Sequence, residues 1–396
     1  MKRKIIAFIS DFLIAALLLG CIYGVNYLIP QKGIMAQTMT AQAADGKLRT
    51  STGSRTSESG NDLSDTATKT PEDTSRKADN LAGGMDRSAD NQAREKELQT
   101  LADNYSNGLP TTRVSLDSQD WHQKFADKFT DQVISTDTSY TSPNVSVQIT
   151  RNSYNTNRLD KSQGGKHVKY GTNISYVLAD IYVSDITCLQ TWFAQNTYGV
   201  GYDEKLSDMS ARMKSVLAVN GDSYSNSRHK SNGTIIRNGV IYRAQPTDME
   251  TCVLNWDGTM KIYNPEEMNT QQLIDSGAYQ SWIFGPSLLD ENGKAKTTFR
   301  TWPYITESHP RTAIGYYEPG HYCMLVVDGR QDSSRGMFLD EMANLFEQLG
   351  CKAAYNLDGG HCSFMTLQDQ VANNPYKPEH KIEDGIFITE IEYVSS

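Results

Sequence analysis

An apolar strand, an amphipathic helix and a second apolar strand follow one another in the last third of this 396-residue chain. The first strand covers residues 324–327, the helix residues 339–349 and the second strand residues 353–357. Two strands joined through a helix in this way run parallel and belong to one sheet. The pattern therefore predicts a βαβ unit and excludes an all-helical or purely hairpin-built domain.

Both predicted strands end in Asp-Gly, as Asp328-Gly329-Arg330 and as Asp358-Gly359-Gly360. Parallel strands bring their carboxyl ends to the same edge of a sheet, where ligand crevices form. A single Asp-Gly after a strand is typical of a turn. Two Asp-Gly pairs at matching ends of one βαβ unit instead predict a binding site. Because Arg311 and Arg330 supply positive charge, the predicted ligand is an anionic, sugar-like substrate. The alternative for both arginines is a surface ion pair, which contributes little.

A third polar cluster, Asn220-Gly221-Asp222, directly follows an apolar strand at residues 216–219. Alternation and β-branched content predict further strands. Asp257-Gly258 predicts a hairpin with a type I′ turn, and Glu318-Pro319-Gly320 predicts a second hairpin between residues 312–317 and 322–327. The predicted fold class is α/β (mixed α+β). We expect a single domain with a mixed sheet that contains the C-terminal βαβ unit. The other predicted strands cover residues 145–150, 174–183, 234–236, 240–243, 252–256, 260–263, 312–317 and 322–327, and a helix covers residues 207–214.

The amino terminus is typical of a membrane anchor. Three basic residues at positions 2–4 precede an apolar run over residues 5–29. Such a run is long enough to span about 30 Å of hydrocarbon, and basic residues in front favour a cytoplasmic start. We expect a single-pass protein whose remaining chain is extracellular. A secretory signal cut after Ala43 and a lipoprotein signal at Cys21 are the alternatives.

A polar stretch without aromatic residues follows, from Gln31 to Asn104. It offers too little apolar area to offset chain entropy, so we expect a disordered stalk. The predicted organisation is a cytoplasmic tip at residues 1–4, a transmembrane anchor at 5–29, a stalk at 30–112 and the folded domain at 113–396.

Charge and cysteine content exclude two classes of protein. With 38 Lys and Arg against 47 Asp and Glu, the net charge of −9 excludes a typical nucleic-acid binder. Five cysteines follow Cys21, without CxxC spacing, so neither a disulfide framework nor a zinc site of the usual spacing is predicted. One pair remains free to bridge, and the sequence does not distinguish which.

Six ordered motifs resemble those of the phosphodiester glycosidase family, which includes the enzyme that uncovers mannose 6-phosphate by removing N-acetylglucosamine. Many bacterial members are described as exopolysaccharide biosynthesis proteins. The resemblance covers the chain from about residue 216 to its end. The motifs are Leu217-Ala218-Val219-Asn220-Gly221-Asp222, Phe284-Gly285-Pro286-Ser287-Leu288, Arg311-Thr312-Ala313-Ile314-Gly315, Val326-Val327-Asp328-Gly329-Arg330, Gly336-Met337-Phe338-Leu339 and Asn356-Leu357-Asp358-Gly359-Gly360.

The resemblance implies hydrolysis of sugar-1-phosphodiesters in cell-surface glycans or exopolysaccharide, with a carbohydrate or sugar-phosphate polymer as the partner. Asp328 and Asp358 are the expected catalytic acids beside the sugar, and Arg311 and Arg330 the expected phosphate ligands. The expected substrate-binding residues are Asn220, Gly221, Asp222, Ser287, Asn356, Gly359, Gly360, His361 and Ser363.

One departure from the family pattern concerns the last motif, which usually reads Gly-Gly-Gly-Ser-Ser-Thr. Here His361 and Cys362 replace its third Gly and first Ser. His361 narrows the space over the glycine loop, which leaves a non-catalytic carbohydrate-binding or exopolysaccharide-assembly protein as the alternative function. No cofactor is expected. A divalent cation such as Ca²⁺ is the alternative, because Asp222, Asp328 and Asp358 carry hard oxygen ligands.

Overall fold

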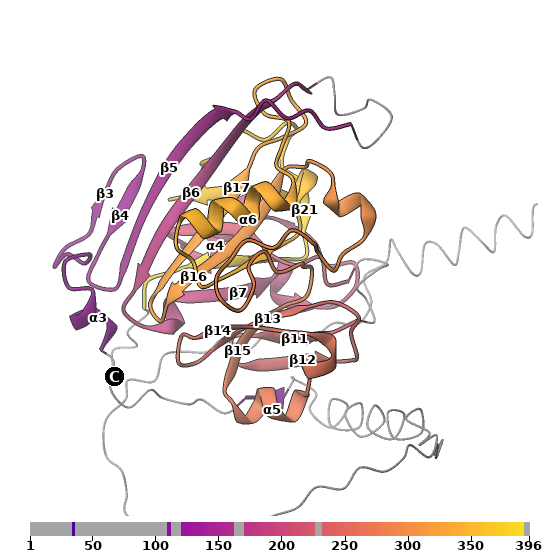
Figure 1. Ribbon diagram of the computed structural model, residues 1–396. Helices are drawn as coiled ribbons and strands as arrows, with labels where there is room; N and C mark the ends of the chain where they lie inside the picture. The colour runs from indigo at the N-terminus through magenta and orange to yellow at the C-terminus, as the bar shows by residue number, and fades with distance from the viewer. Residues whose placement is uncertain (1–33, 36–108, 112–119, 162–169, 226–231, 392–396) are drawn as a thin grey trace, which may run out of the picture.

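The computed structural model describes residues 34–35, 109–111, 120–161, 170–225 and 232–391 (Figure 1). The predicted cytoplasmic tip and transmembrane anchor lie outside these residues. Within them, no helix is long and apolar enough to cross a membrane. The domain is built mostly from strands, with four α-helices in the described ranges: α3 (Trp121–Lys124), α4 (Leu206–Met213), α5 (Thr270–Asp275) and α6 (Leu339–Gln348).

The largest sheet has seven strands in the order β18-β16-β17-β6-β5-β4-β3. Its two longest members, β5 and β6, pair along eleven residues in antiparallel register. The strands are β3 (Ile134–Ser135), β4 (Ser139–Thr141), β5 (Val145–Asn155), β6 (Asn173–Val183), β16 (Arg311–Glu318), β17 (His321–Val327) and β18 (Ala353–Asn356).

A five-stranded sheet has the order β20-β19-β10-β22-β7, and the remaining strands form two three-stranded sheets and two strand pairs. The five-stranded sheet contains β7 (Leu189–Phe193), β10 (Leu217–Asn220), β19 (Met365–Leu367), β20 (Gln370–Val371) and β22 (Asp384–Ile388). The smaller sheets contain β2 (Leu109–Pro110), β11 (Thr234–Arg237), β12 (Val240–Ala244), β13 (Thr251–Asn255), β14 (Met260–Tyr263) and β15 (Ala278–Trp282). The pairs are β1 (Ile34–Met35) with β8 (Thr197–Tyr198), and β9 (Glu204–Lys205) with β21 (Lys381–Ile382).

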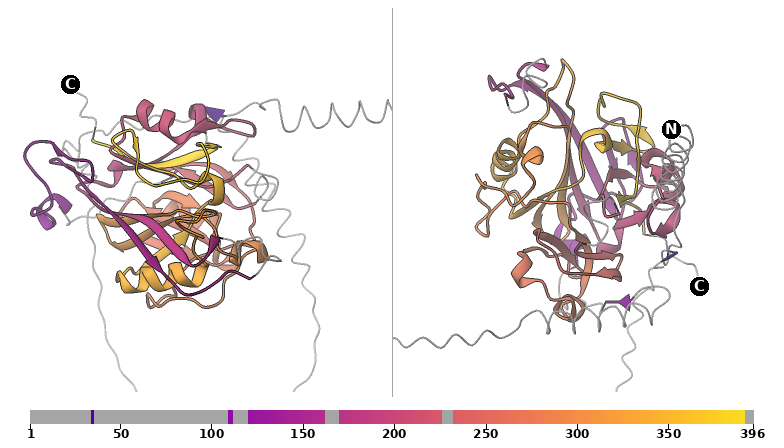
Figure 2. Two further views of the ribbon diagram at one scale, coloured as in Figure 1. Left: turned by 90° about the horizontal axis from the view of Figure 1, so that it is seen from above. Right: turned by 90° about the vertical axis from the view of Figure 1, so that its right-hand side faces the viewer.

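The two large sheets pack face to face, and one helix covers the outer face of each (Figure 2, left). α6 packs on the seven-stranded sheet and α4 on the five-stranded sheet. β17 is therefore buried on both faces, which explains its continuous apolar sequence. Toward the central core it contributes Tyr322, Met324 and Val326. Toward α6 it contributes Cys323, Leu325 and Val327.

The predicted strand, helix and strand are β17, α6 and β18. Both strands are antiparallel to β16, which lies between them, so they run parallel to each other. The prediction of a mixed sheet was wrong in one respect: every strand pair in the described part of the chain is antiparallel. The physical reason is the hairpin between β16 and β17, which inserts β16 into the gap that the crossover leaves.

Turn chemistry fixes the ends of these elements. Gly350 follows α6 with φ of +81°, as expected for a glycine that ends a helix. At the β13–β14 hairpin only Gly258 has a positive φ, whereas a type I′ turn needs two such residues, so the predicted turn type was wrong. The Asp257 carboxylate instead accepts the N–H of Thr259 over 2.8 Å and holds the turn.

Two short strands fall within the stretch predicted to be a stalk. β1 pairs with β8, and β2 pairs with β12. Beside β2, the Thr111 hydroxyl donates to Ala278 O over 2.6 Å. Residues 34–35 and 109–111 therefore pair with strands of the domain, although they precede the boundary expected at residue 113.

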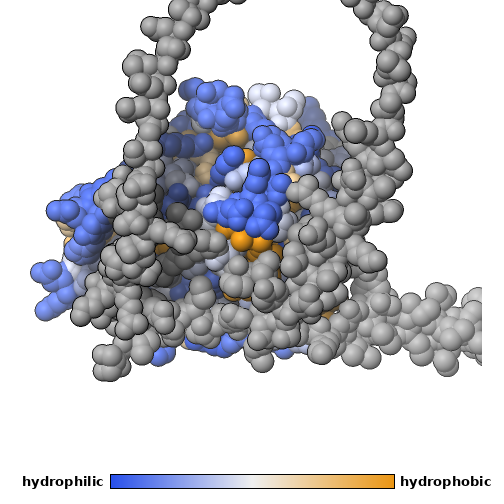
Figure 3. Space-filling view, turned by 90° about the horizontal axis from the view of Figure 1, so that it is seen from below, coloured by the Kyte–Doolittle hydropathy of each residue, from blue (hydrophilic) through white to orange (hydrophobic). Residues whose placement is uncertain are grey.

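Where it is not grey, the face of the molecule seen from below is mainly hydrophilic around a small apolar area (Figure 3).

Candidate active site

Asp328, Arg311 and Asp358 lie at one edge of the seven-stranded sheet. Arg311 begins β16 and pairs with Val327, the last residue of β17. On the other side of β16, β18 ends at the same level. Two strand spacings of about 4.8 Å each therefore separate the backbones that carry the two acids. The register brings both acids and one arginine to a common rim, as the βαβ pattern predicts.

Asp358 is half-buried at this rim, where its Oδ1 accepts the N–H of Gly359 over 2.9 Å. The pKa of Asp358 is raised to about 6, mainly by burial and in smaller part by the nearby carboxyls of Asp222 and Asp384. Hydrogen bonds from the Cys362 thiol and from Gly359 act in the opposite direction. The carboxyl of Asp358 therefore changes its charge just below neutral pH.

Asp328 is more enclosed, with 3% of its surface exposed. Its Oδ1 accepts the Asn373 side-chain amide over 3.0 Å and the Asn374 N–H over 2.9 Å. Its Oδ2 accepts the Ser175 hydroxyl over 3.5 Å. Burial raises the pKa of Asp328 to about 6, against the effect of these donors. The donors fix the orientation of the carboxyl, and Asp358 is the more accessible of the two acids.

Arg330 extends over the glycine loop that follows Asp358. A Cβ placed on Gly360 would lie 3.2 Å from its Nη2. Its Nη1 donates to the Tyr376 hydroxyl over 2.7 Å, and its Nη2 lies 3.3 Å from His309 Nδ1. Arg330 has a φ of +59°, a left-handed conformation that costs free energy for a side chain other than glycine. The strained turn thus aims a half-exposed guanidinium at the rim.

Arg311 is buried, and backbone carbonyls occupy its guanidinium. Its Nε donates to Met337 O over 3.1 Å, and its Nη2 donates to Ile305 O and Glu307 O over 2.6 and 2.5 Å. Burial, together with the charge of Arg330, lowers the pKa of Arg311 to about 9. These contacts make Arg311 a residue that holds the rim segments together, and Arg330 the more available of the two predicted phosphate ligands.

Asn220 connects the end of β10 to the backbone of Asp358. Its Nδ2 donates to Asp358 O over 2.6 Å, and its Oδ1 accepts the Thr312 hydroxyl over 2.6 Å and the Phe364 N–H over 3.4 Å. Its side-chain amide is therefore engaged with protein groups and 1% of the residue is exposed. The structure gives Asn220 a positioning role where the resemblance implied a sugar contact.

Gly221 and Asp222 lie behind the rim. A Cβ on Gly221 would lie 2.5 Å from Asp384 Oδ1, so the close approach of β10 and β22 requires glycine here. Asp222 accepts the N–H groups of Ile283 and Phe284 over 2.8 and 3.1 Å. Gly221 and Asp222 therefore connect β10 to neighbouring segments of the fold. Asp222 is 3% exposed, so it lies behind the rim and not on its surface.

Arg237 lies between two buried carboxylates, Asp222 and Asp384. Its Nη2 lies 2.5 Å from Asp384 Oδ2 and 3.4 Å from Asp222 Oδ2. Burial raises the pKa of both acids, that of Asp384 to about 7, although the positive charge of Arg237 opposes this. This buried cluster connects β10, β11 and β22 beneath the rim.

Ser287 and Asn356 belong to a separate buried network on the far side of β18. Ser287 donates its N–H to Glu250 over 2.9 Å, and Lys296 Nζ donates to Ser287 Oγ over 3.0 Å. Asn356 Nδ2 donates to Gly285 O over 2.7 Å. Neither side chain is more than 2% exposed, so both hold the loop at residues 284–288 against β18.

The loop after Asp358 carries the remaining predicted residues. A Cβ on Gly359 would lie 2.8 Å from Pro310 O, and the Gly360 N–H donates to that carbonyl over 2.9 Å. Ser363 Oγ is buried and has no hydrogen-bond partner among the described residues. These contacts press the glycine loop against the start of β16, next to Arg311.

His361 lines the outer side of this loop. Its Nε2 lies 2.7 Å from Pro378 O, so the Nε2–H donates there. Its ring stacks on His380 at 4.8 Å and lies 5.6 Å from Tyr376. The rings of His361, His380 and Tyr376 therefore lie at the position where the family motif has a glycine.

Glu383 is a rim residue that the sequence pattern did not reveal. Its two carboxylate oxygens accept the N–H and the hydroxyl of Ser225, each over 2.7 Å. Burial raises its pKa to about 7, and the carboxyl of Asp358 adds to that effect. Glu383 directly precedes β22 in a charged stretch of sequence that is typical of an exposed segment. Only its contact with Ser225 in the folded chain reveals it.

Among the residues that the structure describes, no three or more His, Cys, Asp or Glu side chains form a metal-binding group. The three acids considered for a cation accept hydrogen bonds from protein groups, and Asp222 also lies 3.4 Å from Arg237.

Comparison with known families confirms the resemblance given by the motifs: residues 213–389 match the phosphodiester glycosidase family model. Within the curated proteins, the chain is 34% identical over 197 residues to the SPbeta prophage-derived uncharacterized protein YomE of Bacillus subtilis strain 168. That alignment covers 48% of this chain and 29% of the relative, so the chain spans less than a third of that protein's length.

Two solved structures are similar in part. The catalytic domain of zebrafish N-acetylglucosamine-1-phosphodiester alpha-N-acetylglucosaminidase, auto-inhibited by its pro-peptide, shares 20% identity over 63% of this chain and 89% of its own, with a TM-score of 0.47. A hypothetical protein from Synechocystis shares 12% identity over 62% of each chain, with a TM-score of 0.44. Both TM-scores are below 0.5.

Proposed function

We propose that this domain hydrolyses sugar-1-phosphodiester linkages in cell-surface glycans or exopolysaccharide. The observation that carries the proposal is the common rim formed by the ends of β17 and β18, which carry Asp328 and Asp358, with Arg330 over the glycine loop. The rim lies within a stretch that matches the phosphodiester glycosidase family. Cleavage of the bond between C1 and the phosphate oxygen develops positive charge on the sugar and negative charge on the leaving group. Carboxylates beside a guanidinium match that charge pattern.

The residues take distinct roles in this proposal. Asp358, the more accessible acid, acts as the nucleophile or as the base that takes a proton from water. Asp328, held in place by Asn373 and Asn374, stabilises positive charge on the ring. Arg330 binds the phosphate, because its fork of N–H donors matches two phosphate oxygens. Arg311 positions the segments around them.

The overall reaction adds one water molecule. The water oxygen ends on C1, the C1–O bond to phosphate breaks, and the phosphomonoester leaves with the electron pair of that bond. A phosphomonoester is a good leaving group, so the proposal does not require a strong general acid. One proton of the water stays on the new C1 hydroxyl, and the other is released to the departing phosphomonoester or to solvent.

The altered glycine loop favours one other candidate, a carbohydrate-binding or exopolysaccharide-assembly protein that uses the same rim without cleavage. The stacked rings of His361 and His380 narrow the approach to the rim, where the family motif has a glycine. Incubation with a sugar-phosphate polymer distinguishes the two functions: new phosphomonoester ends support the hydrolase, and retention of intact polymer supports the binder. The same assay with a chelator tests the cation: we expect no loss of activity, and a loss that Ca²⁺ restores would assign one.

Replacing Arg330 with Met is expected to lower kcat/KM for a sugar-1-phosphodiester by about 100-fold, because the phosphate loses its charged, bidentate ligand. Lys377→Met is the matched control, since Lys377 carries the same charge on the exposed side of the same aromatic residue, Tyr376. Steady-state kinetics of both variants decide the matter. Equal activity in the two variants would remove Arg330 from the phosphate site.

The activity is expected to fall on the acid side of about pH 6. Asp328 and Asp358 both have pKa values raised to about 6, and both act as carboxylates in the proposal. Protonation therefore removes activity about two pH units higher than ordinary carboxyls would. In a plot of log kcat/KM against pH, we expect a plateau above pH 7 and a slope between 1 and 2 below pH 6. A flat profile down to pH 4.5 would contradict the assignment.

The cellular setting is a proposal of the same kind. Residues 5–29, outside the described ranges, are proposed to anchor the chain in the cell membrane with the amino terminus in the cytoplasm. The domain then lies on the outer side of the membrane, within reach of the sugar-phosphate polymers of the cell surface. Protease treatment of intact cells tests this, because only an external domain would be digested.

A further inference from the structure

Two cysteines, Cys323 and Cys351, lie in contact beneath α6. Their Sγ atoms are 3.7 Å apart, and both residues are at least 97% buried. Of the five cysteines in the described ranges, none is bonded to another, and this is the pair whose sulfur atoms meet. The sulfurs need to approach from 3.7 Å to roughly 2.0 Å to form a bond.

The backbone on both sides of the pair is fixed by β16. Cys323 pairs with Gly315, and the Lys352 N–H donates to Tyr316 O over 2.8 Å. Gly315 leaves the space that the sulfurs occupy: a Cβ there would lie 2.6 Å from Cys323 Sγ and 2.7 Å from the Phe346 ring. A glycine in mid-strand is unfavourable by itself, so this position is explained by the close packing of Cys323 and Phe346 over it.

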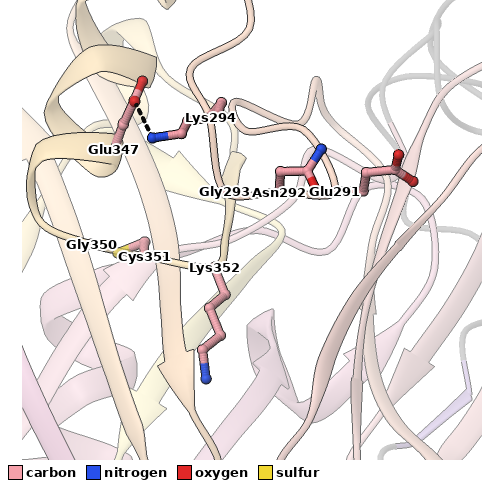
Figure 4. A pocket seen from close by; sticks show the side chains of 8 residues that line it. All are labelled: Glu291, Asn292, Gly293, Lys294, Glu347, Gly350, Cys351 and Lys352. Atoms are coloured by element: carbon pink, nitrogen blue, oxygen red, sulfur yellow. Dashed lines mark hydrogen bonds and ion pairs between the residues drawn. The ribbon is translucent and has the colours of Figure 1, made fainter.

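A surface depression of about 380 Å³ lies at the end of α6 and reaches Cys351 of the pair (Figure 4). Cys351 forms part of its wall, next to Gly350 and Lys352, and the Lys294–Glu347 ion pair crosses its upper side. The depression lies before the start of β18, at the opposite end of that strand from Asp358. It is therefore separate from the candidate active site.

We propose that Cys323 and Cys351 form a disulfide in the mature protein, made by exchange with an external disulfide that enters through this depression. The Cys351 thiolate attacks one sulfur of a low-molecular-weight disulfide such as glutathione disulfide, and one thiol leaves. Cys323 loses its proton to solvent, attacks the Cys351 sulfur and releases the second thiol. Two protein thiols are oxidised and one external disulfide is reduced to two thiols.

The bond would join β17 to the segment that leads into β18. Asp328 and Asp358 follow the opposite ends of these two strands. It closes a loop of about 28 residues, and a loop of that length lowers the entropy of the unfolded chain substantially. For a domain of this size we expect the melting temperature to fall by roughly 5–10 °C when the disulfide is reduced. Activity at moderate temperature should change little.

The test uses the wild-type protein, treated with glutathione disulfide under native conditions, then unfolded, alkylated and digested without reductant. Mass spectrometry is expected to find the peptides of Cys323 and Cys351 joined, with Cys188 and Cys252 alkylated as buried control thiols. Cys323→Ala is expected to lose the dependence of melting temperature on reductant, and Cys252→Ala to keep it. Alkylated Cys323 and Cys351 after oxidation, or either one joined to a different cysteine, would overturn the proposal even if a variant fails to fold.

Discussion

Asp358→Asn is expected to lower kcat/KM for a sugar-1-phosphodiester by about 1,000-fold or more, with the fold intact. Removal of a nucleophile or general base at the reacting carbon has effects of this size. The amide is nearly the same shape as the carboxyl and can still accept the Gly359 N–H that holds this side chain. The backbone contact from Asn220 to the Asp358 carbonyl is unchanged as well. The loss is therefore expected in turnover and not in melting temperature.

Asp332→Asn is the matched control for this variant. Asp332 is an exposed acid on the same rim loop as Arg330, so its replacement removes the same formal charge without touching the site. Its activity should stay within about twofold of wild type. If Asp358→Asn hydrolyses substrate at a rate similar to that of Asp332→Asn, Asp358 is not the catalytic carboxylate.

Arg237→Met is expected to destabilise the domain by about 3–5 kcal/mol at pH 8. The variant leaves Asp222 and Asp384 buried side by side without a countercharge, and an uncompensated buried carboxylate is costly. Arg237 also donates to the carbonyls of Ile236 and Ser281, and these acceptors lose their partner. Because the pKa of Asp384 is already about 7, protonation relieves the repulsion at lower pH. The destabilisation should therefore be smaller at pH 5 than at pH 8.

Chemical denaturation at the two pH values measures this effect. Arg212→Met serves as a control, since the partly exposed pair of Arg212 with Glu204 is expected to contribute less than about 1 kcal/mol. Combining Arg237→Met with Asp384→Asn should recover part of the lost stability. Equal effects of Arg212→Met and Arg237→Met would show that the buried cluster is not a main support of the rim.

The strand β17 and the helix α6 could be predicted because a strand that is buried on both faces has a continuously apolar sequence. Met324 and Leu325 face different cores, one between the sheets and one under α6, so the run is continuously apolar. The parallel relation of β17 and β18 followed from the helix between them. The hairpin of β16 with β17 was predicted from the short turn between them and is confirmed. That β18 pairs with the other side of β16 was not predicted, since nothing local in residues 353–357 specifies which strand they join.

The roles of individual polar residues were harder to predict than their positions. Asn220 and Arg311 lie at the predicted rim, yet the amide of Asn220 binds protein groups and Arg311 donates to carbonyls. A sequence motif does not reveal whether a polar side chain faces a ligand or the backbone of a distant segment. Glu383 was missed for the converse reason, because its neighbourhood with Asp358 arises only when β22 pairs with β10.

Hydrolysis of a defined sugar-1-phosphodiester in ¹⁸O-labelled water tests the central claim most directly. Attack at C1, guided by Asp358 and with the phosphate held by Arg330, places the label in the released sugar and leaves the phosphomonoester unlabelled. Mass spectrometry of the two products distinguishes this from attack at phosphorus. Label in the sugar is the predicted result; label in the phosphomonoester, or no hydrolysis of any such diester by the folded domain, would contradict it.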